Sequence, residues 1–126
     1  MKRILGLAIV SLIAFPSTAL AADWVLVNES SDGTRIFIDN ESYEKRGTIA
    51  WYWQLVKQES GVDEVTFKTS YFSMDCRNRK VRLREGFQHD STGKLIFSHS
   101  YGDTGPLMQI IPDTTGEKIF RAVCFR

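Results

Sequence analysis

The chain has 126 residues, of which 43% are hydrophobic and 25% are charged, and its formal net charge at pH 7 is +1. This length is enough for one domain, and the balance of 16 basic against 15 acidic side chains excludes the strongly basic field of nucleic-acid-binding proteins. The high content of apolar and aromatic residues excludes a disordered chain.

The first 22 residues have the pattern of a cleaved secretory signal peptide. Two basic residues and an apolar run over 4–15 precede the small residues Ala19 and Ala21, whose spacing signal peptidase recognises. The run is shorter than the roughly 20 residues of a membrane-spanning helix. We therefore expect no membrane span, cleavage after Ala21 or Ala22, and export of a single domain formed by residues 23–126.

Six segments of this domain are predicted to be β-strands, because β-branched and aromatic residues cluster there between Gly, Asn, Asp and Ser residues. Their expected bounds are 24–28, 34–39, 48–58, 65–76, 80–89 and 94–100. The polar turns at 28–33 and 90–93 are short, so the strands that they join should be antiparallel.

Side-chain alternation predicts which face of the third strand is buried. Ile49, Trp51, Trp53 and Leu55 share one face, which we expect to form the centre of the core. This assignment leaves Tyr52 on the outward face. A stacking platform made of Trp51, Tyr52 and Trp53 is the alternative, but a single outward tyrosine does not make one.

Two further expectations concern the following strands. The apolar positions of 65–76 change from odd to even numbers, which predicts a β-bulge near 69–72. In the last hairpin we expect a three-residue turn with Gly93 at positive φ. This turn fixes which residues of the two strands pair and which face of the sheet each side chain occupies. The expected pairs are Phe87 with Phe97 and His89 with Leu95, with Leu83 and Phe87 inside and Arg82 and Arg84 outside.

After Tyr101 the strand pattern stops, and Gly102–Pro112 forms a connection of about a dozen residues. Such a connection is either a binding loop or a crossing to the other side of the sheet. Thr114 and Glu117 then fit a capping box, and a helical stripe follows them. The stripe consists of Ile119, Phe120, Val123 and Cys124.

Cys76 and Cys124 are the only cysteines, and export would bring them into an oxidising compartment. We expect them to form a disulfide that ties the C-terminal helix to the end of a strand. Closing this loop should stabilise the domain by about 4 kcal/mol. The predicted fold class is α+β: a single six-stranded antiparallel sheet with a C-terminal helix packed on one face and tethered by the disulfide.

The segment 76–84 is strongly basic. Alternation sends three of its cations to one strand face, which suits sulfates, phosphates or an acidic protein partner. The alternative is a solvated strand face balanced by acidic neighbours at Asp63, Glu64 and Glu85. The candidate partner-binding residues are Arg77, Arg79, Lys80, Arg82 and Arg84, of which the last three share the face.

The chain has no G-x-S-x-G or H-E-x-x-H motif and no phosphate-binding glycine loop followed by Lys, and we expect no catalytic activity, cofactor or metal. His89 and His99 lie out of register in the predicted hairpin, roughly 13–17 Å apart at about 3.4 Å per residue. This separation is too large for both to bind one ion. A single histidine as axial ligand to haem is the remaining alternative to an ordinary surface histidine.

Taken together, several features resemble the surface-adhesin protein E family of Gram-negative bacteria. They are Trp24, Ile38-Asp39, the Trp51/Trp53 strand, Asp75-Cys76 before a basic stretch, Pro112 and Val123-Cys124. The resemblance implies the fold predicted above and binding to host matrix proteins such as vitronectin and laminin. The family's adhesin can also dimerise and take up haem, so the resemblance adds a homodimer and haem binding to the alternatives. An exposed sheet edge is the expected place for a homodimer.

One departure bears on location. The family's adhesin is lipidated at a cysteine directly after its signal, whereas this chain has Ala21-Ala22-Asp23-Trp24 there. We therefore expect a periplasmic or secreted protein rather than a surface-attached one. The leading function is a non-enzymatic exported binding module for a protein or polyanionic macromolecule. The alternatives are a periplasmic envelope-accessory or inhibitor domain, and a domain that binds haem or another small ligand.

Overall fold

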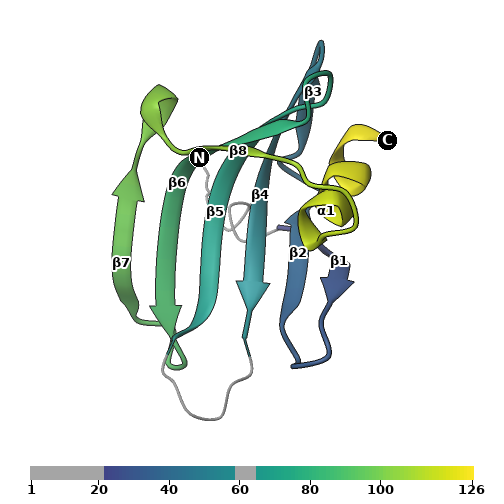
Figure 1. The fold of residues 1–126 in the computed structure, drawn as a ribbon. Coiled ribbons are helices and arrows are strands. Elements are labelled where there is room, and N and C mark those ends of the chain that lie inside the picture. The colour runs from purple at the N-terminus through teal and green to yellow at the C-terminus, as the bar shows by residue number, and fades with distance from the viewer. Residues whose placement is uncertain (1–21, 59–64) are drawn as a thin grey trace, which may run out of the picture.

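The structure, a computed structural model, describes residues 22–58 and 65–126, which form one antiparallel sheet and a C-terminal helix (Figure 1). The strands are β1 Trp24–Glu29, β2 Arg35–Asp39, β3 Glu44–Arg46, β4 Ile49–Lys57, β5 Val65–Asp75, β6 Lys80–Asp90, β7 Leu95–Ser100 and β8 Leu107–Gln109. A 3₁₀ turn, η2, covers Gly102–Thr104, and the helix α1 covers Thr115–Cys124. The predicted antiparallel sheet with a C-terminal helix is confirmed.

The main sheet has the strand order β1-β2-β4-β5-β6-β7, with β3 paired to β4 and β8 paired to β6. The six predicted strands match the six strands of this order within two residues at every end. The short strands β3 and β8 were not predicted, because their sequences EKR and LMQ are too short to show alternation.

The helix α1 lies across one face of the sheet, over the half that contains β1, β2 and β4 (Figure 1). We call this the covered face. Its buried side chains pack against Ile119, Phe120 and Val123 of the helix. Those contributed by the sheet include Ile36, Ile38, Ala50, Tyr52 and Met74. The apolar core is therefore the layer between helix and sheet.

The assignment of faces in β4 was wrong. Ala50 and Tyr52 are on the covered face, 0% and 1% exposed, whereas Trp51 and Trp53 are half-buried on the opposite face, which we call the open face. Both sets of residues in β4 are apolar, so alternation alone does not tell which one the helix covers. The position of α1, set by residues 60 or more positions away, decides it.

A register shift lies within the predicted range, between Tyr71 and Phe72, but the extra residue belongs to β6 and not to β5. The pairing of β5 with β4 is continuous from Ile49–Asp75 to Lys57–Phe67, so β5 has no insertion relative to β4. Between β5 and β6, Tyr71 pairs with Glu85 and Phe72 with Leu83. The extra residue is therefore Arg84 of β6. The change of apolar phase in β5 arises because the strand is apolar on both faces.

The bulge at Arg84 also changes the faces of the last hairpin. Leu83 pairs with Phe72 of the covered face, whereas Phe87 contacts Trp53 on the open face, with ring centroids 6.1 Å apart. Leu83 and Phe87 were expected to lie on the same face, and this expectation was wrong. Gly93 has the predicted positive φ, 90°, and His89 pairs with Leu95 as predicted. Phe97 pairs with Gln88 instead of Phe87, because the register shifts between Gln88 and His89.

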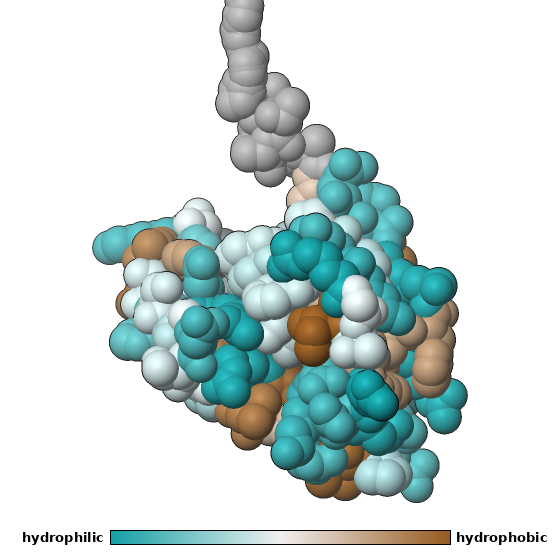
Figure 2. Space-filling model, turned by 90° about the horizontal axis from the view of Figure 1, so that it is seen from above, coloured by the Kyte–Doolittle hydropathy of each residue, from teal (hydrophilic) through white to brown (hydrophobic). Residues whose placement is uncertain are grey.

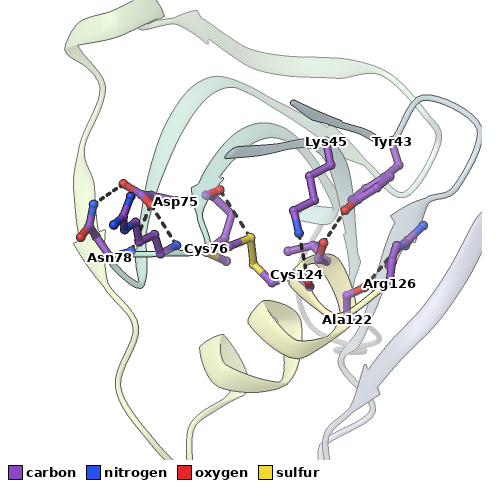
Figure 3. The surroundings of a disulfide bond; sticks show 11 residues. Tyr43, Lys45, Asp75, Cys76, Asn78, Ala122, Cys124 and Arg126 are labelled. Carbon is purple, nitrogen blue, oxygen red and sulfur yellow. Dashed lines mark hydrogen bonds between the residues drawn. A yellow bond between two sulfur atoms is a disulfide. The ribbon is translucent and has the colours of Figure 1, made fainter. Parts of the chain in front are cut away.

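The C-terminal helix has the predicted cap residue, Thr114, and the predicted tether, but the Glu117 carboxylate bonds to the N–H of Asp113 and not to that of Thr114. Glu117 N–H donates to Thr114 Oγ1 at 3.4 Å, and the Glu117 carboxylate accepts from Asp113 N–H at 2.8 Å. Cys124 forms the disulfide with Cys76 at the end of β5, with 5.7 Å between their Cα atoms (Figure 3). The disulfide therefore joins the last turn of α1 to the sheet.

Two side chains from the β3 hairpin reinforce this end of the helix (Figure 3). The Tyr43 hydroxyl donates to the Val123 carbonyl, and Lys45 Nζ donates to the Cys124 carbonyl at 3.3 Å. Terminal carbonyls of a helix lack partners within the helix. Donors from the sheet satisfy them here, so the covered face is closed by covalent and polar contacts together.

Candidate functional site

A basic and aromatic surface lies on the open face, on the strands β3, β4 and β6. It contains Arg46, Trp51, Lys80, Arg82 and Arg84, and we call it the Trp51–arginine surface. Trp51 pairs with Ser73, Ser73 pairs with Arg82, and Arg82 pairs with Leu107, so these side chains form one row across four strands. A shallow pocket of about 240 Å³ lies along this row and is lined by Trp51 and by Lys80, Arg82 and Arg84.

Trp51 stands at the centre of this surface between two arginines. The Arg84 guanidinium lies over the indole with 4.7 Å to the ring centroid, and the Arg46 guanidinium lies over it at 4.8 Å. Arg84 reaches Trp51 from β6 and Arg46 from β3, on either side of β4. Guanidinium groups stack on indole through cation–π attraction, so the ring holds both side chains in defined positions.

Arg84 is the most constrained cation of the surface, with only 18% of its side chain exposed. Its Nε donates to Ser73 Oγ at 3.0 Å, and its Nη1 donates to the Asp103 carboxylate of η2. The Asp103 side chain is 93% exposed. Asp103 therefore offers Arg84 a carboxylate from the solvent side, as an acidic partner would.

Arg82 joins the surface to the loop that follows η2. Its Nη1 donates to the Gly105 carbonyl at 2.8 Å, and Leu83 N–H donates to the Pro106 carbonyl at 3.0 Å. Gly105 is buried, and a Cβ at this position would lie 1.8 Å from the Leu83 carbonyl oxygen. Only glycine permits this close approach of loop and strand. The predicted connection 102–112 thus lies beside the predicted basic strand.

The charges of Lys80 and Arg82 are the least compensated. The partner of Arg82 is a neutral carbonyl, and Lys80 is exposed and forms no ion pair with the residues that the structure describes. Asp75 also lines the pocket, and hydrogen bonds from the Asn78 side chain and backbone lower its pKa, so it is ionised at neutral pH. Asp75 turns its oxygens toward its own turn, where it accepts from Arg77 N–H and Asn78.

The two remaining candidate cations lie outside this surface. Arg77 is exposed in the turn between β5 and β6. Arg79, at φ 55°, places its guanidinium 4.5 Å from the Phe120 ring centroid and 3.4 Å from the Glu117 carboxylate. Its contacts are with α1, so Arg79 joins the turn to the helix on the covered side.

A second pocket, of about 200 Å³, lies on the covered face between α1, β8 and the sheet. Its lining is mainly apolar and includes Tyr52, Phe72, Met74, Met108, Ile110 and Ile119. Burial raises the pKa of Tyr52 far above its ordinary value, so its phenol is neutral. Neither His89 nor His99 lines this pocket.

The two histidines are on different faces of the hairpin. His89 pairs with Phe67 on the open face. His99 pairs with Gly86, which in turn pairs with Ser70 on the covered face. The His99 ring lies 4.2 Å from that of Tyr101. Within the described part of the chain, no group of three or more His, Cys, Asp or Glu side chains is placed to hold a metal ion.

The side of the molecule seen in Figure 2 is mixed in hydropathy. On the side that Figure 2 shows, hydrophobic side chains form separate areas among hydrophilic ones. Leu107 and Met108 of β8 are 51% and 44% exposed. None of the helices in the described ranges has the length and hydropathy to cross a membrane.

Trp51 is the functional candidate that the sequence analysis misplaced, because it was assigned to the core. A clue was present: Cys76 shares its strand face with Met74 and Phe72, and the disulfide places α1 over that face. The helix must then cover the face of Phe72, and the tryptophans that pair with Tyr71 and Ser73 lie on the other face. Asp103 and Gly105 gave no comparable indication, since their contacts depend on how the loop folds back.

One of three comparisons with known proteins found a match. The model of the family "Surface-adhesin protein E" matches residues 24–125, which is nearly the whole part of the chain after the predicted leader. No significant match was found among curated proteins or among solved structures. Because the match covers most of the chain, the protein belongs to the surface-adhesin protein E family.

Proposed function

We propose that this protein is an exported, non-enzymatic binding module that holds an acidic segment of a partner macromolecule on the Trp51–arginine surface. Membership of a surface-adhesin family supports adhesion as the general role. The observation that supports this particular surface is the convergence of Lys80, Arg82 and Arg84 beside Trp51 in one pocket. The neighbouring loop 102–112 forms one rim of it.

The fixed geometry of Arg84 favours binding. Ser73 and Trp51 hold its guanidinium in place, so little side-chain entropy remains to be lost when a carboxylate or sulfate arrives. A planar guanidinium binds such groups through two parallel hydrogen bonds. Lys80 and Arg82 supply charge that attracts the same groups from a distance.

The decisive test is binding of defined acidic probes to matched variants. The probes are a hexaglutamate peptide and heparin, together with immobilised vitronectin and laminin. The variant K80Q/R82Q is compared with K68Q/K118Q, which removes two exposed lysines elsewhere and changes the net charge equally. We expect about tenfold weaker binding for the first and less than twofold for the second, because only the first pair lines the pocket.

Two results would contradict this proposal. Equal losses for the two variants would mean that binding depends only on net charge. Binding that does not weaken between low and high salt would exclude an electrostatic surface. Circular dichroism of each variant tests whether the fold is intact.

A substitution of Asp103 should strengthen binding, whereas the substitutions above should weaken it. Because Asp103 occupies the outer side of Arg84, Asp103→Asn should free the guanidinium for an incoming carboxylate. We expect two- to fivefold stronger binding of the hexaglutamate peptide. A weaker affinity would show that Asp103 positions Arg84 instead of competing with the ligand.

Location distinguishes an adhesin from the envelope-accessory or inhibitor alternative. Cell fractionation combined with protease treatment of intact cells measures whether the mature protein is exposed. Cleavage by added protease supports a role in host contact. Protection, with release in the periplasmic fraction, supports an envelope partner that uses the same surface.

The apolar pocket under α1 supports a second candidate function, the binding of a small apolar ligand. Its volume of about 200 Å³ is below the roughly 300–1,000 Å³ of most ligand sites. It offers no imidazole to haem iron, so haem titration should give no Soret shift that depends on His99. A shift abolished by His99→Ala would show that haem binds elsewhere, next to Tyr101.

A further inference from the structure

A larger pocket of about 420 Å³ lies on the open face where β1 begins. Trp24, Trp53 and Phe87 provide aromatic walls, and Asp39 and Ser42 provide polar groups. Ala22 also lines the pocket. The first described residues of the chain therefore lie at a pocket that is both aromatic and acidic.

Asp39 is an unusual residue within this pocket, because it is a carboxylate only 6% exposed. Its Oδ1 accepts from Asp23 N–H at 2.8 Å and from Glu41 N–H at 3.0 Å, and its Oδ2 accepts from Ser42 Oγ at 2.6 Å. Burial acts to raise the pKa of Asp39, but the hydrogen bonds, that of Ser42 first, outweigh it and lower the pKa. Asp39 is therefore ionised at neutral pH.

No cation in the described part of the chain compensates this buried charge. Among the described residues, none of the ion pairs includes Asp39, and no Lys or Arg lines the pocket. The donor to Asp39 that lies far from it in the sequence is the backbone nitrogen of Asp23, which in the uncut chain is a neutral amide. A buried carboxylate gains more from a charged donor than from a neutral one.

We propose that this pocket is the seat of the protein's own new N-terminus, which forms when the leader is cut between Ala22 and Asp23. Hydrolysis of that peptide bond by a signal peptidase consumes one water, leaves a carboxylate on Ala22, and turns the Asp23 nitrogen into an α-amine. This amine takes up a proton at neutral pH and becomes an ammonium group at the position that already contacts Asp39.

The surroundings favour a positive charge at this position. The backbone holds Asp23 in place, since Asn40 N–H donates to the Asp23 carbonyl at 2.8 Å. The faces of Trp24 and Trp53 in the same pocket attract cations. Asp39 and His89 are the titratable groups that line the pocket, and Asp39 is the one whose side chain contacts the Asp23 nitrogen. Cleavage thus completes an ion pair that the precursor lacks.

The inference rests on the export that we propose, but its test does not require export or a partner. Three purified proteins are compared: one that begins with a free Asp23 amine, the same protein with Asp23 Nα-acetylated, and one that begins at Ala22. Acetylation preserves the amide donor of the precursor and removes only the charge. Each is unfolded in urea, with and without Asp39→Asn.

We expect the free Asp23 amine to lower the unfolding equilibrium constant about tenfold relative to the acetylated protein, with no such difference in Asp39→Asn. We also expect the α-amine pKa to rise by about one unit above its ordinary value of about 7.7–8.0, which corresponds to the same tenfold factor. The pKa measurement on the unmutated protein decides the question even if Asp39→Asn does not fold.

Equal stability of the free and acetylated proteins, or an ordinary α-amine pKa, would overturn the ion pair. The mass of the exported protein tests the cleavage bond: a mature chain that begins with Asp23 supports it, and one that begins with Ala22 overturns it. Neither result depends on the Trp51–arginine surface, so loss of acidic-probe binding leaves this inference unaffected.

Discussion

The covered and open faces of the sheet use neighbouring residues of the same strands in different ways. On the covered face, Ala50 and Tyr52 are excluded from water beneath α1. On the open face, Trp51 and Trp53 remain half-exposed and contact aromatic rings and guanidinium groups. In the function proposed above, a single strand, β4, serves stability with one set of side chains and recognition with the other.

This difference teaches that apolar content does not identify the core in this fold. A sheet with a helix on one side leaves its other side open to water, and large aromatic residues there have no structural layer to pack against. The open-face aromatics instead contact one another and the arginines, which keeps them ordered without burying them. Substitutions on the two faces should therefore separate stability from binding.

The largest stability effect should come from the covered face through its disulfide. Cys76→Ser with Cys124→Ser should lower the free energy of unfolding by about 4 kcal/mol, because the loop of 48 residues regains its entropy in the unfolded chain. Urea unfolding measures the loss. Thiol titration of the unreduced, denatured wild type should find no reactive thiol, and two thiols per chain would contradict the bridge.

A neighbouring pair of substitutions in β2 compares the faces directly. Ile38 is fully buried on the covered face and Phe37 is half-buried on the open face. We expect Ile38→Ala to cost about 3 kcal/mol and Phe37→Ala about 1 kcal/mol, although phenylalanine is the larger side chain. Urea unfolding of both variants provides the measurement. Equal costs would indicate that the open face is covered in solution.

The helix cap should have a smaller effect that is confined to the covered face. Thr114→Ala removes the side-chain acceptor of Glu117 N–H and should cost about 1 kcal/mol. Helical ellipticity should be lost before the fluorescence of the open-face tryptophans changes. Simultaneous loss of both signals would show that α1 and the sheet unfold as one unit.

The pH dependence should be the smallest effect in this series. The hydrogen bond from Asp113 N–H, with Arg121 and Arg79 nearby, lowers the pKa of Glu117 below its ordinary 4.5. Its stabilisation is therefore complete above about pH 4.5 and is lost as the pH falls through the lowered pKa. Stability measured at pH 6 and pH 3 should differ less in Glu117→Gln than in the wild type. An unchanged difference would assign the effect to other carboxylates, of which Asp39 and Asp75 also have lowered pKa values.

The sequence predicted what depends on neighbours along the chain. Strand bounds follow from local residue type, and the cap at Thr114 with the apolar stripe of α1 follows from helical spacing. The grouping of Lys80, Arg82 and Arg84 on one face was also correct, because alternation along β6 is preserved between Lys80 and Arg84. These features required no knowledge of the tertiary structure.

The errors concern features that the tertiary structure decides. Which face of β4 is buried depends on where α1 lies, and the extra residue at Arg84 becomes visible only when β6 is aligned with β5. Arg79 was grouped with the partner-binding candidates, and its left-handed backbone turns its guanidinium toward Phe120, outside the Trp51–arginine surface. Asp103 reaches Arg84 only because the chain returns beside β6.

The close contact at Gly105 provides a criterion for sorting members of this family. Any side chain at this position would collide with the Leu83 carbonyl, so the loop could no longer lie against β6. A relative that retains the arginines but replaces this glycine keeps the charge and loses the rim that shapes it. The residue at position 105, which makes no contact with a partner in this proposal, should therefore distinguish relatives that share the binding surface from relatives that share only the fold.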